Sequence, residues 1–306
     1  MKPRLARGLL YSCLFLVAQA FQGHAQSTAT PSQTPAAPQA PPAGQPAPRP
    51  QIQGQEENSG EGAISVQLYY WLTTTANPKM GAGSQHVATT PGDLDAMGKS
   101  KPSPGIVVSF PAGKDNSIRI SYFRTQGDGN TTATKDLNLF STDYTAGDYL
   151  ATRYTLQDAK VSLDFLSYPT PIEGHKFRFK TLWEVQYVTI YSSVDAPLKP
   201  VAVDSSGTAI SNTGEATKWF IFPSLGAAIE HTVSRNFRWE ARFSGFGIPH
   251  HAALWDAQAF AAFRVDRVEV TAGYKGFFFK TSPNADQFLK ATLSGAYVGV
   301  TWYPRW

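Results

Sequence analysis

Two adjacent histidines and a nearby aspartate are the side chains of this sequence best suited to hydrolytic chemistry. His250 and His251 follow Pro249, and Asp256 comes five residues after His251. A carboxylate and an imidazole held together can orient a water molecule for nucleophilic attack. However, adjacent residues on an extended chain point to opposite sides, and Pro249 favours a turn. The simpler interpretation is two solvent-exposed loop histidines, and the catalytic set His250, His251 and Asp256 is the alternative.

Other motifs exclude most further chemistry. The sequence contains no phosphate-binding P-loop, no dinucleotide-binding glycine pattern between strand and helix, and no G-x-S-x-G. The segments Asp93-Leu94-Asp95 and Gly127-Asp128-Gly129-Asn130 offer oxygen ligands, but neither completes the calcium-loop pattern. Tight turns explain both segments better. We therefore expect no cofactor and no metal.

The first residues have the layout of a secretory signal peptide. Met1–Arg7 holds three basic residues, Leu9–Ala18 is apolar, and small residues follow up to Ala25. The apolar run is too short to span a membrane, which takes about 20 residues. We expect residues 1–25 to be removed. Because Cys13 is the single cysteine, the mature chain would have no disulfide, no thiolate metal site and no cysteine nucleophile.

Residues 26–62 are rich in proline and read as a disordered periplasmic tether. The alternative is a recognition segment for peptidoglycan or another periplasmic partner. The formal charge of +4 comes from 27 basic and 23 acidic residues, and three of the basic ones lie in the predicted signal peptide. The remaining 24 basic residues nearly balance the 23 acidic ones, so we expect no nucleic-acid partner.

From residue 63 to residue 306 the apolar residues recur with period two, which indicates strands with two different faces. Phe177, Phe179 and Trp183, for example, alternate with Arg178 and Lys180. The pattern predicts ten mostly long strands, near residues 63–73, 105–111, 117–125, 149–166, 176–191, 218–231, 236–247, 252–265, 267–280 and 288–303.

The expected connections differ in length between the two ends of these strands. Short turns fall near 112–116, 167–175, 232–235 and 265–267, whereas long loops fall at 74–104, 126–148 and 192–217. Short turns at one end and long loops at the other are typical of membrane barrels, whose strands have about 9–11 residues. We predict an all-β fold: an antiparallel up-and-down transmembrane β-barrel of about ten strands (eight or twelve being alternatives), over residues 63–306. A soluble exported β-sandwich that binds a ligand is the other architecture with this pattern.

The C-terminal residues support the barrel. Val298, Val300 and Trp302 share one face with the terminal Trp306. In this strand the chain resembles the bacterial outer-membrane β-barrel superfamily, with its OmpA-like and porin-like barrels. The resemblance implies an assembly signal at these four residues, read by the barrel-assembly machinery, and an outer-membrane location with lipid around the barrel.

The same superfamily includes enzymes. Omptin proteases use Asp and His residues at the outer rim of a ten-stranded barrel, so the resemblance keeps the rim hydrolase as the second reading. Lipid A deacylases use His and Ser two residues apart, and no histidine here has that spacing. We expect a non-enzymatic protein.

Charged residues of mixed sign are expected inside the barrel, and tryptophans at its two rims. Paired signs favour a plugged lumen, whereas a ring of one sign would favour an ion-selective pore. Trp71, Trp219 and Trp255 would mark the outer rim, and Trp239, Trp302 and Trp306 the inner one. The predicted lumen residues are Arg119, Asp164, Arg178, Lys180, Glu184, Arg238, Glu240, Arg242, Asp256, Arg264, Glu269 and Lys275.

Three roles fit this reading: envelope structure, surface binding through the long loops, and passage of small solutes. Binding usually occurs on long loops held by a rigid scaffold. The sequence does not name a ligand.

Overall fold

The computed structural model describes residues 64–76, 79–82, 99–113, 116–168, 177–201, 203, 205–208, 211–248, 252–281 and 287–304. The predicted signal peptide and tether lie outside these residues. Within the described residues, no helix is long and apolar enough to cross a membrane.

All elements of the described residues are strands. In chain order they are β1 (Ser65–Ala76), β2 (Lys79–Ala82), β3 (Lys99–Ser100), β4 (Ser103–Pro111), β5 (Ser117–Thr132), β6 (Leu137–Leu139), β7 (Thr142–Tyr144), β8 (Tyr149–Tyr168), β9 (Phe177–Asp195), β10 (Thr213–Ser234), β11 (Phe237–Ile248), β12 (Ala252–Val265), β13 (Val268–Lys280) and β14 (Gln287–Trp302).

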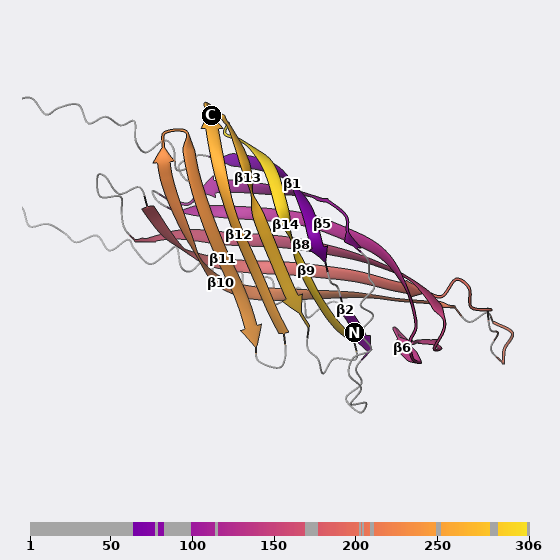
Figure 1. Ribbon diagram of the computed structural model, residues 1–306. Helices are drawn as coiled ribbons and strands as arrows, with labels where there is room; N and C mark the ends of the chain where they lie inside the picture. Colours follow the sequence, from indigo (N-terminus) through magenta and orange to yellow (C-terminus); the bar gives the residue numbers. More distant parts are fainter. Residues whose placement is uncertain are drawn as a thin grey trace, which may run out of the picture. The chain divides into compact units, whose positions relative to one another are not determined.

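Ten of these strands close into an antiparallel barrel (Figure 1). Consecutive neighbours pair from β1 through β4, β5 and β8 to β14, and β14 pairs back with β1. The short β2 extends the row of β1 along β14, and β3 extends the row of β4 along β5. The predicted fold and the count of ten are therefore confirmed, and the alternatives of eight or twelve strands are wrong.

The outward face of the barrel carries an apolar band. On β9, Phe177, Phe179, Trp183, Val185 and Tyr187 are all exposed. The first and the last of these residues are ten positions apart. At a rise of about 3.3 Å per residue and a strand tilt of about 40°, they lie about 25 Å apart along the barrel axis. That is the height of the lipid-facing band of a membrane barrel, so a bilayer can cover these side chains.

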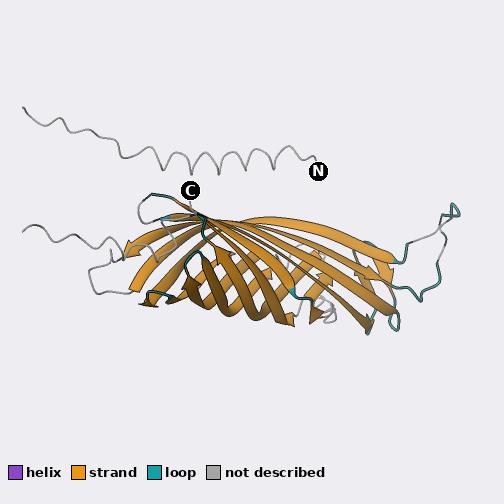
Figure 2. Ribbon diagram, turned by 90° about the horizontal axis from the view of Figure 1, so that it is seen from above, coloured by secondary structure: helices purple, strands orange, loops and turns teal. Residues whose placement is uncertain are grey.

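Above this band the outward face becomes polar at the same level on neighbouring strands. Tyr187 and Trp219 stack at the boundary, with ring centroids 6.3 Å apart. On β5 the outward residues beyond Tyr122 are Arg124, Gln126, Asp128, Asn130 and Thr132. The strands β5, β8, β9 and β10 thus continue past the band into what we call the outer extension, which comprises residues 124–132, 149–157, 188–195 and 213–218. Its roughly eight residues on β9 reach about 20 Å beyond the boundary. Figure 2 shows the long strands projecting at one end of the barrel.

The outer extension corrects two predicted loops. The segment 126–148 begins as strand up to Thr132 and then forms the separate hairpin β6–β7, and 192–217 contains the ends of β9 and β10. In the extension parts of β5 and β10, polar or small residues occupy both faces, so the apolar–polar alternation is lost there. The sequence therefore reads as a polar loop there.

The predicted tryptophan rims are correct only in part. Trp219, Trp255 and Trp302 are exposed on the outward face. Trp71 is completely buried inside the barrel, where its indole N–H donates to the Gly295 carbonyl at 3.2 Å. Trp71 is next to an outward-facing residue on β1. Because successive side chains of a strand point to opposite faces, Trp71 points into the barrel. Trp306 lies outside the described residues.

Candidate functional site

An arginine from one wall of the barrel reaches a carboxylate on another. Arg242 on β11 donates two hydrogen bonds to Asp164 on β8, from Nη1 to Oδ2 at 2.7 Å and from Nη2 to Oδ1 at 2.9 Å. The Ser162 hydroxyl donates to the same carboxylate at 2.6 Å. The strands β8 and β11 are not neighbours in the sheet. This bidentate pair, a strong and geometrically specific contact, therefore crosses the lumen.

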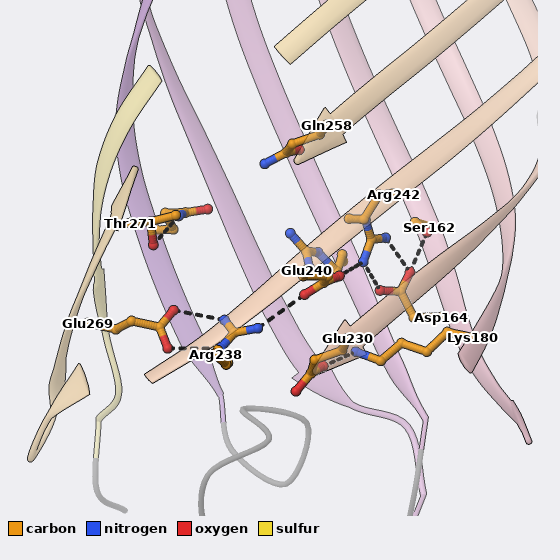
Figure 3. Close-up of polar contacts among 12 residues, drawn as sticks. Ser162, Asp164, Lys180, Glu230, Arg238, Glu240, Arg242, Gln258, Glu269 and Thr271 are labelled. Atoms are coloured by element: carbon orange, nitrogen blue, oxygen red, sulfur yellow. Dashed lines mark hydrogen bonds and ion pairs between the residues drawn. The ribbon is translucent and has the colours of Figure 1, made fainter. Parts of the chain in front are cut away.

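Glu240 on β11 is the centre of the network that surrounds this pair (Figure 3). Its carboxylate accepts from Arg242 at 2.8 Å and from Arg238 at 3.1 Å, and Arg119 lies 3.9 Å away. Arg238 also donates twice to Glu269 on β13, at 2.8 and 3.1 Å. One carboxylate thus connects the ion pairs of the inner half of the lumen.

A second ion-pair cluster lies further from the short-turn end. The Lys160 ammonium on β8 lies 2.8 Å from Asp256 on β12 and 3.5 Å from Glu184 on β9. Lys275 on β13 lies 3.7 Å from the same Asp256 oxygen. Of these contacts, the one between Lys160 and Asp256 crosses the lumen, and the other two join neighbouring strands. A further pair, Lys180 with Glu230 at 2.6 Å, connects the neighbouring strands β9 and β10.

Aromatic and aliphatic side chains close the outer part of the lumen. Phe123 packs edge-on against Trp71 and Phe277, with ring centroids 5.3 and 5.4 Å apart. Apolar residues continue outward into the outer extension and are completely or almost completely buried: Leu150, Leu156, Val188, Ile190, Val194, Phe222, Leu254 and Leu293. The interior therefore changes from charged to apolar along the barrel axis.

Two small cavities remain in the charged part. One, of about 30 Å³, is lined by residues of both ion-pair clusters, and the other, of about 50 Å³, lies nearer the short-turn end. A water molecule needs about 10–15 Å³ of such volume. Each cavity holds a few water-sized particles, and neither is the wide passage of a porin.

The structure brings most of the predicted lumen residues together. Arg178 is half-buried on the lumen side of β9, next to Glu230 in the β9–β10 ladder. Arg264 is the exception: it lies at the short-turn end of β12, where it donates to the Asp266 carbonyl and its guanidinium lies 4.0 Å from the Tyr303 ring centroid. That position is at the mouth of the barrel, because β12 ends one residue later.

Three charged lumen residues were missed: Asp158 and Glu230, which are buried, and Lys160, whose side chain is 14% exposed. The signal that could have found them is parity. Asp158 and Lys160 have the same parity on β8 as the predicted Asp164, and all three point inward.

The alternative catalytic set is only partly described. His250 and His251 lie outside the described residues. Asp256 is buried in the lumen, where its carboxylate accepts a hydrogen bond from Lys160 at 2.8 Å and lies 3.7 Å from the Lys275 ammonium. His231, the one histidine within the described part of the chain, stacks on Phe177 at 4.0 Å near the short turns. The rim hydrolase stays a prediction without support from these contacts.

The expectations about metal binding and about the assembly signal stay predictions. Among the described residues, no group of three or more His, Cys, Asp and Glu side chains could hold a metal ion. Val298, Val300 and Trp302 are about half-exposed on the outward face of β14. Trp306 lies outside the described residues, and reading by the assembly machinery stays a prediction.

The β6–β7 hairpin is tied to the outer extension by one tyrosine. The Tyr144 hydroxyl donates to the Val194 carbonyl at 2.8 Å and accepts from the Gly214 amide at 3.0 Å. Burial raises the pKa of this phenol. At the end of the hairpin loop, the Thr145 backbone amide donates to Asp148 at 2.8 Å, which lowers the pKa of that carboxyl.

Comparisons with known proteins agree with the architecture. No protein-family profile and no curated protein sequence match this chain. The solved structure of the outer membrane protease OmpT from Escherichia coli is similar, with a TM-score of 0.56 and 9% identity over 80% of this chain and 97% of that chain. The transport unit of the autotransporter AIDA-I from Escherichia coli has a TM-score of 0.38 at 9% identity, over 83% of this chain and 94% of that one. The Pseudomonas putida toluene transporter TodX has 0.31 at 9% identity, over 80% and 90%. At these identities the likeness to OmpT concerns the fold alone, a closed antiparallel β-barrel.

Proposed function

We propose that this protein is an exported outer-membrane barrel with a closed lumen, which acts through surface binding at its outer extension. The observation that carries the proposal is the filled interior. Ion pairs cross the inner half and apolar packing fills the outer half, and two cavities in the charged part, among the described residues, have volumes of about 30 and 50 Å³. The apolar outward band, with aromatic residues at its boundary, supports a location in a bilayer.

The loop between β9 and β10 supports a binding role for the outer extension. Its side chains Leu198, Val201 and Val203 are 77, 65 and 64% exposed. Three large apolar side chains so exposed on one loop favour contact with a partner. The loop follows the parts of β9 and β10 that reach beyond the apolar band, so it is presented away from the bilayer.

Planar-bilayer conductance of the refolded mature chain tests the closed lumen. We expect no stable current steps, with heat-modifiable mobility on gels as the check that the barrel is folded. Stable steps from the folded protein would contradict the closed lumen and favour passage of small solutes.

Partitioning of cells into hexadecane tests the exposed loop. Cells that display the protein should partition more than cells without it. The triple variant Leu198→Ser, Val201→Ser, Val203→Ser should remove the difference at equal display. Equal partitioning of wild-type and variant cells would reject this loop as the binding surface.

A further inference from the structure

The smaller of the two cavities has an unusual set of lining residues. All four ionisable side chains among them with a formal charge at neutral pH are basic: Arg119, Lys160, Arg242 and Lys275. The other polar groups can donate hydrogen bonds. They are the hydroxyls of Tyr69, Ser121, Ser162 and Tyr297, and the amide of Gln258. No carboxylate belongs to the lining, because Asp164 and Asp256 contact the cations on the side away from the cavity.

Lys275 in this lining is short of acceptors. The side chain is only 6% exposed. Its nearest carboxylate oxygen, on Asp256, lies 3.7 Å away, beyond hydrogen-bond distance, and within the described residues no hydrogen bond from its ammonium group is present. The ammonium lies 4.5 Å from the Phe123 ring centroid and 5.4 Å from that of Trp71. An ammonium has three donors, and leaving them unpaired in a buried site is costly.

Arg119 repeats this pattern from the opposite wall. Its one ion pair within the described residues is with Glu240, at 3.9 Å. The guanidinium therefore has donors in excess of the acceptor that holds it. One buried and one partly exposed cation, each with donors to spare, thus line a single polar cavity.

An anion entering from the short-turn end would have to pass the larger cavity, which is lined by three basic and four acidic side chains. The larger cavity, of about 50 Å³, shares Val107 and Arg119 with the smaller one and extends to residues at the ends of β1, β5 and β14: Ser65, Ser117 and Thr301. On the outer side, Trp71, Phe123 and Phe277 close the route.

We propose that the smaller cavity binds one small monovalent anion of the halide class, such as chloride. The volume of about 30 Å³ is room for about two water-sized particles. A halide fits this volume, whereas sulfate or phosphate, with five heavy atoms, does not. The anion would accept hydrogen bonds from Lys275 and Arg119 and join the two walls of the barrel.

Chloride NMR on the refolded full-length mature chain in detergent tests the site. The folded protein should broaden the ³⁵Cl line beyond the same protein after heat unfolding, and bromide should reverse the broadening at lower concentration than sulfate. The variants Lys275→Met and Arg119→Gln should each weaken chloride binding at least tenfold. Lys101→Met, at an exposed lysine that pairs with Asp128 of the outer extension, should leave it unchanged.

The two cavity variants make the result decisive. If Lys275→Met does not fold, Arg119→Gln still reports, because its side chain is 19% exposed and held by one long contact. Broadening that both folded variants retain would overturn the proposal and leave water as the occupant. Broadening that sulfate reverses as well as bromide does would also overturn it, because surface lysines would then explain the signal. Conductance plays no part here, so this test and the closed-lumen test fail separately.

Discussion

Each buried carboxylate of the inner network has a cationic partner on another strand. Arg242 pairs with Asp164, Arg238 with Glu269, and Lys180 with Glu230. Parity on a strand predicts that a charged side chain points into the lumen. It cannot predict the partner, because pairing across the barrel depends on closure and tilt. Glu230 was missed because no other residue of its parity between Phe220 and Thr232 is charged, so β10 shows no charged face there.

Arg242→Ala should destabilise the barrel by about 3–5 kcal/mol, because the carboxylates of Asp164 and Glu240 would stay buried without the guanidinium that pairs with them. Urea unfolding of the refolded protein measures the change. The matched control is Arg153→Ala, whose partner Asp128 and own side chain are both exposed, and which should cost at most about 1 kcal/mol. Equal effects of the two substitutions would show that the lumen pair is not a buried contact.

The local stability of the loop that follows β7 should depend on pH through the carboxyl group of Asp148. Its pKa in the folded protein is lowered, chiefly by the Thr145 amide. Stabilisation from such a group is complete above the unfolded pKa of about 4 and is lost as pH falls through the lowered folded value. Protection of the Thr145 amide in hydrogen exchange, corrected for the intrinsic rate, should therefore decrease from pH 6 to pH 3. In Asp148→Asn the protection should be low and independent of pH, and a wild-type protein with constant protection would contradict the assignment.

At the scale of elements, strand number and order followed from sequence, and strand ends did not. Alternation is strong where one face meets lipid and the other meets the charged lumen, as in β9 between Phe177 and Tyr187. It fails in the parts of β5 and β10 that belong to the outer extension, where outward residues become polar and inward ones include small residues such as Gly127 and Gly214. Turn-like composition then hides strand, and the hairpin β6–β7 gives no clear period because its strands have three residues each.

A charge on the lipid face tests where the apolar band lies. Leu225 on β10 is 61% exposed and pairs with Trp183 near the middle of the band. Leu225→Arg should therefore cost about 2–4 kcal/mol in phospholipid vesicles, because the guanidinium enters hydrocarbon near the midplane. Thr217→Arg, eight residues closer to the outer end of the same strand, should cost at most about 1 kcal/mol. Urea unfolding in vesicles compares them, and similar costs would place both residues in the same environment.

For the whole molecule, closure of the sheet determines what the interior can do. Ten strands leave a narrow interior, and residues such as Phe222 and Tyr297 occupy much of it. The long strands β8, β9 and β10 then add surface only at the end away from the short turns. A barrel of this kind gains surface on one side of a membrane without gaining a passage through it. That asymmetry makes its orientation the most informative property to measure.

Orientation can be measured by labelling single cysteines along β10. If Cys13 leaves with the signal peptide, the mature chain has no cysteine of its own, so an introduced one reports without background. On intact cells a charged, membrane-impermeant maleimide should label Thr217→Cys. It should label Arg235→Cys, in the short turn after β10, only after the outer membrane is permeabilised. Leu225→Cys should stay unlabelled in both conditions, because lipid covers it. The opposite pattern for Thr217→Cys and Arg235→Cys would place the outer extension in the periplasm. Labelling of all three in a detergent-free soluble fraction would mean that the barrel is not in a membrane.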